Sequence, residues 1–285
     1  MKLVIVSGRS GSGKSTALNI FEDLGFYCID NLPVGLLPNL ITQMPRDKAN
    51  STDVAVSIDA RNVPSELANF ADFIHQIDQS KCKIEIVYLD ADSDTLLTRF
   101  SATRRKHPLT GPDIPLLEAI NREGELLSHI TEMADLRIDT THLSMHQLRS
   151  MVKNRVIQKQ GNEMSLLFES FGFKHGIPKD SDLVFDVRCL PNPYWDPQLR
   201  KYCGQDTPII EFLENEKSVN AMFEDISRFL KNWLPQFQEN NRTYMTVSIG
   251  CTGGQHRSVY MAERLFRHHM DSLSNVQLRH RELNT

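Results

Sequence analysis

Residues 2–15 read Lys2-Leu3-Val4-Ile5-Val6-Ser7-Gly8-Arg9-Ser10-Gly11-Ser12-Gly13-Lys14-Ser15. Within this stretch, Gly8 to Ser15 match G-x-x-x-x-G-K-[ST], the phosphate-binding P-loop. The glycines let backbone N–H groups turn onto phosphate oxygens, Lys14 reaches the β- and γ-phosphates, and the Ser15 hydroxyl is a Mg²⁺ ligand. The apolar run before the motif predicts a buried parallel strand, and residues 16–25 after it have apolar side chains at helical spacing. The stretch therefore predicts a nucleotide site between a strand and a helix.

The rest of the chain continues this alternation. Strand patterns lie at residues 26–29, 54–58, 84–89, 136–138, 164–171, 182–188 and 245–249, and helical patterns at 144–160 and 259–269. Strands that alternate with helices are typical of an α/β fold with parallel sheets. A length of 285 residues suits two domains. We expect a P-loop domain at residues 1–158 and a second α/β domain at 159–285.

Acidic residues follow several of the predicted strands. Asp30, Asp59 and Asp90 come directly after the runs that end at residues 29, 58 and 89. Ligands of open parallel sheets bind at the carboxyl ends of the strands, so Asp59 and Asp90 are candidates to order Mg²⁺ with the nucleotide. The same residues also suit a helix cap or a turn.

A cluster of cations follows the strand at 84–89. Residues 99–108 read Arg-Phe-Ser-Ala-Thr-Arg-Arg-Lys-His-Pro on a predicted helix. Such a segment suits closure over nucleotide phosphates, where fixed guanidinium groups stabilise negative charge, and it equally suits a solvated basic helix.

Composition narrows the class of protein. Apolar residues make up 40% and charged residues 24% of the chain, values of a globular protein, and a net charge of −4 gives no global sign of nucleic-acid binding. No apolar stretch is long enough for a membrane span or a signal-peptide core, so we expect a cytoplasmic protein without a membrane partner. The 5 cysteines have no C-x-x-C spacing, which favours reduced thiols over disulfides or zinc.

A second glycine-rich loop lies near the end of the chain. It reads Gly250-Cys251-Thr252-Gly253-Gly254-Gln255-His256-Arg257-Ser258 and fits C-x-x-G-x-x-R-[ST], the phosphate cradle of cysteine-dependent phosphatases. Backbone amides, a helix N-terminus and an arginine fork favour a bound anion. Those phosphatases usually have histidine before the cysteine, whereas this chain has Gly250. Cys251 is therefore either a small residue facing the anion or a nucleophile.

The chain resembles, over essentially its whole length, the RapZ/YvcJ family of bacterial P-loop proteins. The resemblance rests on Gly8–Ser15, residues 26–33, residues 168–176 and Gly250–Ser258. It implies a kinase-like N-terminal domain that binds ATP and GTP and hydrolyses them slowly. Gly8–Ser15 would be the ATP loop and Asp59-Ala60-Arg61-Asn62 the GTP motif, with Ser15 and Asp90 as candidate Mg²⁺ ligands.

The resemblance also implies a C-terminal domain that senses glucosamine-6-phosphate, binds small regulatory RNA and presents it to an endoribonuclease. The sugar-phosphate site would comprise His175, Asp186, Arg188, Thr252, Gly253, His256 and Arg257. Two departures from the family pattern are Tyr194, where close relatives have histidine before Trp-Asp, and the absence of the basic tail of enterobacterial members.

A modest basic face remains near the end of the chain. Residues 257–281 hold five arginines and three histidines against two acids, which predicts either an RNA site or a solvated helix. The RNA candidates are Arg264, Arg267, His268, His269, Arg279 and Arg281. We expect a regulatory adapter that forms a homo-oligomer. The alternative is a small-molecule kinase fused to a cysteine phosphatase-like domain.

Overall fold

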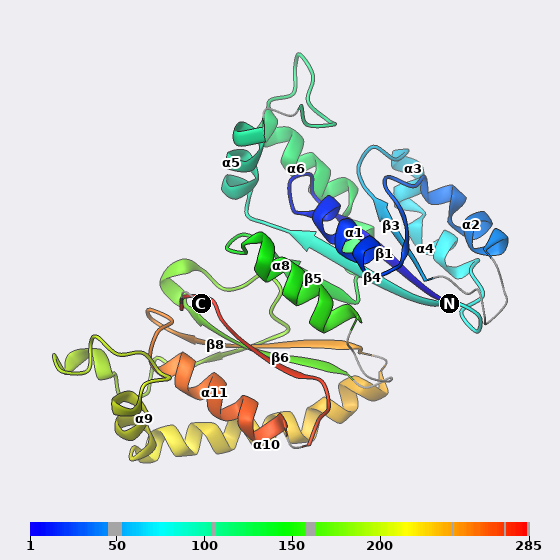
Figure 1. Cartoon of the computed structure of the whole chain (residues 1–285). Coiled ribbons are helices and arrows are strands. Elements are labelled where there is room, and N and C mark those ends of the chain that lie inside the picture. The colour runs from blue at the N-terminus through cyan, green and yellow to red at the C-terminus, as the bar shows by residue number, and fades with distance from the viewer. Residues whose placement is uncertain (45–52, 104–105, 158–163, 241, 271, 284–285) are drawn as a thin grey trace. The chain divides into compact units, whose positions relative to one another are not determined.

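The computed structural model covers the chain and describes all residues except 45–52, 104–105, 158–163, 241, 271 and 284–285 (Figure 1). The chain divides into two compact units, Met1–Ile157 and Gln158–Thr285. We call them the N-terminal and the C-terminal unit.

A parallel sheet forms the centre of the N-terminal unit. Its strands are β1 (Lys2–Gly8), β2 (Tyr27–Ile29), β3 (Val54–Ile58), β4 (Lys83–Asp90) and β5 (Leu136–Asp139), in the order β2-β3-β1-β4-β5. Leu3 pairs with Val54 on one side and with Ile84 on the other. β3 is buried along its whole length, as β1 is after Lys2, which explains the continuous apolar runs: helices cover both faces of the sheet.

The order of the strands locates the binding edge of this sheet. From β1 the chain passes to β2 and β3 on one side and then to β4 and β5 on the other. Ligands of open α/β sheets bind at such a reversal, beyond the carboxyl ends of the strands. The connecting helices are α1 (Lys14–Asp23), α2 (Leu37–Gln43), α3 (Pro64–Ala68), α4 (Phe70–His75), α5 (Ser93–Thr103), α6 (Leu116–Leu126), α7 (Ser128–Glu132) and α8 (Met145–Val152).

The C-terminal unit has a second parallel sheet. It comprises β6 (Ser165–Gly172), β7 (Leu183–Asp186), β8 (Tyr244–Cys251) and β9 (Val276–His280), in the order β7-β8-β6-β9. Its helices are α9 (Thr207–Glu214), α10 (Lys217–Glu239) and α11 (Arg257–Met270). Phe168, Val247, Leu230 and Met261 are fully buried in the core between sheet and helices.

The α/β architecture confirms the predicted fold class, with two differences in detail. The predicted helix at 144–160 begins at Met145 but gives way to a π-helical turn at Lys153–Ile157, and residues 158–160 lie outside the described part. Strand β9 was not predicted, because its sequence Val-Gln-Leu-Arg-His mixes apolar and basic residues. Within the described ranges, no helix combines the length and the apolar character that crossing a membrane requires.

Candidate functional site

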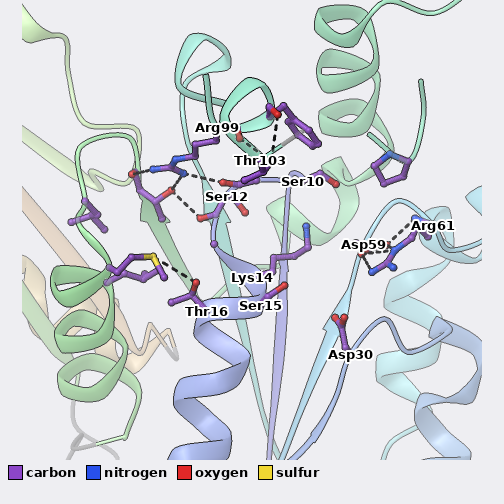
Figure 2. A pocket seen from close by; sticks show the side chains of 18 of the residues that line it. Ser10, Ser12, Lys14, Ser15, Thr16, Asp30, Asp59, Arg61, Arg99 and Thr103 are labelled. Atoms are coloured by element: carbon purple, nitrogen blue, oxygen red, sulfur yellow. Dashed lines mark hydrogen bonds and ion pairs between the residues drawn. The ribbon is translucent and has the colours of Figure 1, made fainter. Parts of the chain in front are cut away.

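The P-loop forms the floor of a large cavity at the reversal point of the N-terminal sheet (Figure 2). The cavity has a volume of about 890 Å³, toward the upper end of the range for small-molecule sites. We call it the N-terminal pocket. Its lining comprises Ser10–Thr16, Asp30, Asp59, Arg61, Arg99, Phe100, Thr103, Lys106, Pro108, Thr140, Leu143–Met145 and Leu148.

Gly8 and Gly13 allow the loop to turn between β1 and α1. Both have positive φ, at 144° and 107°. A Cβ atom on Gly8 would lie 1.9 Å from the carbonyl oxygen of Leu89, so only glycine fits beside β4. Ser12 Oγ is buried and has no hydrogen-bond partner among the described residues. A phosphate oxygen is a group that would satisfy it.

Lys14 is held in the position that the motif requires. Its ammonium donates a hydrogen bond to the carbonyl of Gly8 at 2.6 Å, and the residue is 9% exposed. Burial lowers the pKa of Lys14, while the charges of Glu123 and Asp59 act in the opposite direction. A bound triphosphate would add negative charge and favour the ammonium form.

The two predicted Mg²⁺ ligands have different surroundings. Ser15 is exposed in the pocket and its hydroxyl makes no hydrogen bond with any described residue, so it fits a nucleotide-bound Mg²⁺. Asp90 accepts a hydrogen bond from Arg9 Nε at 2.7 Å and is outside the pocket lining, so its role with Mg²⁺ stays a prediction. Across the described residues, no group of three His, Cys, Asp or Glu side chains is placed to hold a metal by itself.

The predicted GTP motif lies beside the P-loop. Asp59 is 3% exposed, and its carboxylate holds the guanidinium of Arg61, with Nη2 to Oδ2 at 2.6 Å. Burial acts to raise the pKa of Asp59, but the hydrogen bonds from Arg61 and the charge of Lys14 outweigh it, so the pKa is lowered. Asn62 Oδ1 accepts a hydrogen bond from the backbone of Val34, and Ala60 is buried. Asp59 and Arg61 therefore line the pocket, whereas Ala60 and Asn62 support its wall.

The basic segment after β4 is only partly involved. Arg99 donates to the carbonyl oxygens of Gly11 and Thr140, so it braces the P-loop instead of projecting freely over the phosphates. Lys106 is exposed and lines the pocket. The predicted cations Arg104 and Arg105 lie outside the described residues.

A buried acidic residue that the sequence analysis missed contacts the loop. Glu123 of α6 is fully buried and accepts hydrogen bonds from the backbone N–H and the hydroxyl of Ser10, each at 2.7 Å. His107 Nε2 lies 2.9 Å from the same carboxylate. No sequence motif includes Glu123. Its place between the buried residues Ile120 and Leu127 is nevertheless unusual, because charged side chains are rarely buried.

The second glycine-rich loop joins β8 to α11 in the C-terminal unit. Cys251 is 3% exposed, and its Sγ accepts a hydrogen bond from the backbone N–H of Gly254 at 3.2 Å. Ser258 Oγ lies 3.1 Å from the same sulfur. Gly254 has φ of 72°, and a Cβ atom there would lie 2.7 Å from the backbone nitrogen of Gly172. The loop thus curls around the thiol and packs closely against the end of β6.

The predicted sugar-phosphate residues gather at one edge of the second sheet. Asp186 ends β7 and Arg188 lies just beyond it, His175 follows β6, and Thr252 to Arg257 follow β8, the strand between them. Asp186 holds Arg188 with Oδ2 to Nη2 at 2.7 Å, and these hydrogen bonds lower the pKa of Asp186. Arg257 Nη1 donates to the carbonyl of Arg188 at 2.7 Å.

Arg257 and His256 are both buried beneath this edge. Arg257 is 4% exposed, and its Nε has no hydrogen-bond partner among the described residues. His256 is 7% exposed, and burial lowers its pKa, with the charge of Arg257 acting in the same direction. A neutral His256 beside a buried Arg257 leaves a net positive charge at the start of α11.

The RNA candidates do not form one open face. Arg267 and His268 are exposed on the last turns of α11, while Arg264 donates to Asn220 Oδ1 at 2.7 Å. His269 does not fit a surface contact, because it is 5% exposed and its ring stacks on Phe168. Arg279 pairs with the buried carboxylate of Glu169, and Arg281 is half-buried after β9.

Comparison with known proteins identifies the family of this chain. The profile described as the RapZ-like N-terminal domain matches residues 1–160, and that of the RapZ C-terminal domain matches residues 164–284. A nucleotide-binding protein of Marinobacter nauticus is 58% identical over 99% of this chain and 97% of its own length. One of Hahella chejuensis is 56% identical over 99% of both chains. Among solved structures, shikimate kinase from Acinetobacter baumannii is similar to 55% of this chain over 94% of its own, with 15% identity and a TM-score of 0.39. The chain therefore belongs to the RapZ family, as a nucleotide-binding protein with a P-loop.

Proposed function

We propose that this protein is an adapter for RNA decay. In this proposal the N-terminal pocket binds ATP or GTP with Mg²⁺, and the C-terminal unit binds glucosamine-6-phosphate and a small regulatory RNA. The protein then presents the RNA to an endoribonuclease, and the sugar phosphate modulates this step. Membership of the RapZ family supports the proposal.

One observation is the main support for binding of a sugar phosphate by the C-terminal unit. The guanidinium of Arg257 is almost fully buried at the start of α11, and its Nε has no partner among the described residues. A buried cation with an unsatisfied donor is costly unless an anion reaches it. The adjacent loop supplies backbone N–H groups and Thr252, and the helix N-terminus adds a favourable dipole. A phosphate monoester satisfies these groups together.

The sugar part of the ligand would contact the neighbouring strand ends. His175, Asp186 and Arg188 are exposed there, and they offer charged and hydrogen-bonding groups to hydroxyls and an ammonium. The amino group of glucosamine-6-phosphate suits a carboxylate such as Asp186, whose lowered pKa keeps it charged. This chemistry favours an amino sugar phosphate over a neutral sugar phosphate.

Calorimetry tests this assignment. We expect glucosamine-6-phosphate to bind the full chain and glucosamine, which lacks the phosphate, to bind much more weakly. Arg257→Lys should reduce the affinity by about 10-fold or more, because an ammonium cannot reproduce the planar fork. Arg228→Lys on the exposed face of α10 is the matched control. Equal affinity for both sugars would refute the phosphate site.

RNA binding and the formation of a homo-oligomer are tested by separate measurements. Ultraviolet crosslinking in cells should recover small RNA on the parent protein, and its absence at normal expression would refute the adapter role. Arg267 and His268 are the accessible candidates for phosphate contacts, so the double alanine variant should recover less RNA. We also propose a homo-oligomer, which light scattering of the full chain tests directly.

A second candidate function rests on the thiol of the C-terminal loop. Ser258 Oγ lies 3.1 Å from Cys251 Sγ, an arrangement that stabilises a thiolate when the hydroxyl donates. This observation favours a cysteine phosphatase, as part of a protein whose N-terminal unit is a small-molecule kinase. The absence of histidine at position 250, which is glycine, weighs against this candidate.

A further inference from the structure

A carboxylate with one unengaged oxygen lies on the β2–β3 side of the N-terminal pocket. Asp30 directly follows β2, is exposed, and lines the pocket together with Lys14 and Arg61. Figure 2 shows Asp30, Asp59 and Arg61 on one side of Lys14, and Arg99 and Thr103 on the other. Asp30 Oδ1 accepts a hydrogen bond from Ser57, whereas Oδ2 accepts none from any described residue.

The backbone around Asp30 is shaped to orient this carboxylate. Asn31 is the only non-glycine residue with positive φ in the described chain, at 52°. Its N–H donates to Ser57 Oγ at 2.7 Å, so the hydroxyl of Ser57 is left to donate to Asp30. Ser57 is fully buried in β3. The left-handed conformation of Asn31 and the buried hydroxyl of Ser57 both serve to orient the exposed carboxylate of Asp30, which is typical of a functional position.

The neighbouring carboxylate cannot take the same role. Both oxygens of Asp59 accept hydrogen bonds from the Arg61 side chain, and Oδ1 also accepts one from the backbone N–H of Arg61. These contacts hold the pKa of Asp59 below its ordinary value despite burial. Asp59 is thus a poor proton acceptor, and Asp30 is the carboxylate of this pocket with a lone pair to offer.

The two ends of the pocket suit the two ends of a nucleotide. Phe100, Leu143, Met145 and Leu148 give the α5–α8 end an apolar lining, which suits a base. The P-loop lies between the two ends and holds the phosphates. The terminal phosphate would therefore face the end where Asp30 lies, on the same side of Lys14 as Arg61 (Figure 2).

We propose that Asp30 is the catalytic base for transfer of the γ-phosphoryl group to a hydroxyl acceptor, which is water when no other acceptor is present. The inference rests on the nucleotide binding proposed above. The acceptor oxygen bonds to the γ-phosphorus, and its proton passes to Asp30 Oδ2. The bond between the γ-phosphorus and the β–γ bridging oxygen breaks, and its electron pair leaves with the nucleoside diphosphate. Lys14 stabilises the negative charge that develops there.

The variant Asp30→Asn isolates the proton transfer. Its amide oxygen still accepts the hydrogen bond of Ser57, but it takes no proton from an attacking hydroxyl. We expect the kcat for hydrolysis of Mg-ATP and Mg-GTP by the full chain to fall about 100-fold or more, since a general base contributes at least that much. The Kd for each nucleotide should stay within about threefold of the parent value. Asp72→Asn, at an exposed position of α4, is the matched control.

Each result has a defined meaning. A parental kcat in Asp30→Asn would overturn the proposal, and so would a parent that binds nucleotide without hydrolysing it. Loss of nucleotide affinity in a variant that keeps the parental melting temperature would also overturn it, because Asp30 would then hold the nucleotide or its Mg²⁺. Asp30→Ala provides a second variant with the same expected split between kcat and Kd. A parent that binds neither nucleotide refutes the proposed function instead.

Discussion

The backbone N–H of Ser10 donates a hydrogen bond to Glu123 Oε2 at 2.7 Å, across 113 residues of sequence. The Ser10 hydroxyl donates to the other oxygen, and His107 Nε2 lies 2.9 Å from Oε2. Both Glu123 and His107 have fully buried side chains. Burial acts to raise the pKa of Glu123, but the hydrogen bonds from His107 and Ser10 and the charge of Lys14 outweigh it, so the pKa is lowered. A charged Glu123 thus fixes the P-loop to α6.

Glu123→Gln should loosen this connection. The amide has the same size as the carboxylate, but one of its two oxygens is replaced by an NH₂ group, which cannot accept a hydrogen bond. At least one of the buried donors around it therefore loses its partner. We expect the free energy of unfolding to fall by about 1–3 kcal/mol, the usual cost of an unsatisfied buried polar group. Urea unfolding measures it. Glu118→Gln, exposed on the same helix, should change the free energy by less than about 0.5 kcal/mol.

Lys14→Ala should weaken nucleotide binding without unfolding the chain. Lys14 supplies a charge to the phosphates, and its hydrogen bond to the carbonyl of Gly8 is one contact among many in the loop. Hydrogen bonds to charged groups contribute about 1.5–3 kcal/mol, so the Kd for ATP and GTP should rise about 10- to 100-fold. Calorimetry measures the Kd for both nucleotides, with Lys81→Ala, at an exposed position, as the control. Unchanged affinity for both nucleotides would show that the P-loop assignment is wrong.

The sequence predicted the strands of the N-terminal sheet closely. Residues 54–58 and 84–89 were predicted as strands and form β3 and most of β4, because continuous β-branched and apolar runs mark strands buried on both faces. The Mg²⁺ role of Asp90 stays a prediction, but its pairing with an arginine could not be read from the sequence. A sequence shows that Asp90 ends a strand, but only the fold shows that Arg9 turns back from the P-loop to pair with it.

The same limit applies to contacts between distant residues. Glu123 was missed because it lies in no motif, and burial of its pair with His107 follows from how α6 packs beside the loop. His269 was chosen for its charge on a basic stretch, yet helical periodicity places it on the face of α11 that packs against Phe168. Sequence gives residue type and spacing, whereas exposure depends on the partner of each helix face.

Cys251→Ser separates the adapter from the phosphatase. If Cys251 only shapes the cradle, the variant should bind glucosamine-6-phosphate within about threefold of the parent, because a hydroxyl also accepts the hydrogen bond of Gly254. The parent should then turn over p-nitrophenyl phosphate no faster than Cys251→Ser does, with Cys189→Ser, which alters an exposed thiol, as the control. A burst of nitrophenol that disappears in Cys251→Ser would establish the nucleophile.

The stability of the C-terminal unit should depend on pH through His269. Burial lowers the pKa of His269 to about 4, and Nε2 has no hydrogen-bond partner among the described residues. Between pH 4 and the ordinary value of 6.5, the unfolded chain therefore binds more protons at this residue than the folded chain. The folded state keeps its full stability above pH 6.5 and loses stability as the pH falls through this window.

Comparing a variant with the parent isolates this residue. His256 and His280 have pKa values lowered mainly by burial and act in the same direction, so the parent loses stability from several groups. His269→Leu should lose less stability than the parent between pH 7 and pH 5, as measured by urea unfolding of the full chain. His75→Leu, at an exposed position of the N-terminal unit, should follow the parent. Identical pH dependence in all three proteins would rule out a buried neutral His269.

Sugar phosphate and RNA should weaken each other's binding. Arg257 at the first turn of α11 is the phosphate candidate, and exposed Arg267 on its last turns is the RNA candidate. At a rise of about 1.5 Å per residue the two lie about 15 Å apart, beyond the Debye length of about 8 Å at 0.15 M salt. We therefore expect saturating glucosamine-6-phosphate to raise the Kd for a labelled RNA hairpin by only about two- to fivefold at that salt, and by more at 0.02 M.

Linkage requires that the hairpin raise the Kd for glucosamine-6-phosphate by the same factor, so titrations in both directions provide an internal check. The coupling should shrink in Arg267→Ala, which removes a proposed RNA contact on α11, and persist in Arg228→Ala, at an exposed position of α10. If glucosamine-6-phosphate left the RNA affinity unchanged at low salt, the two ligands would not be coupled through the electrostatic potential along α11. Full RNA binding by Arg267→Ala would place the RNA elsewhere on the protein.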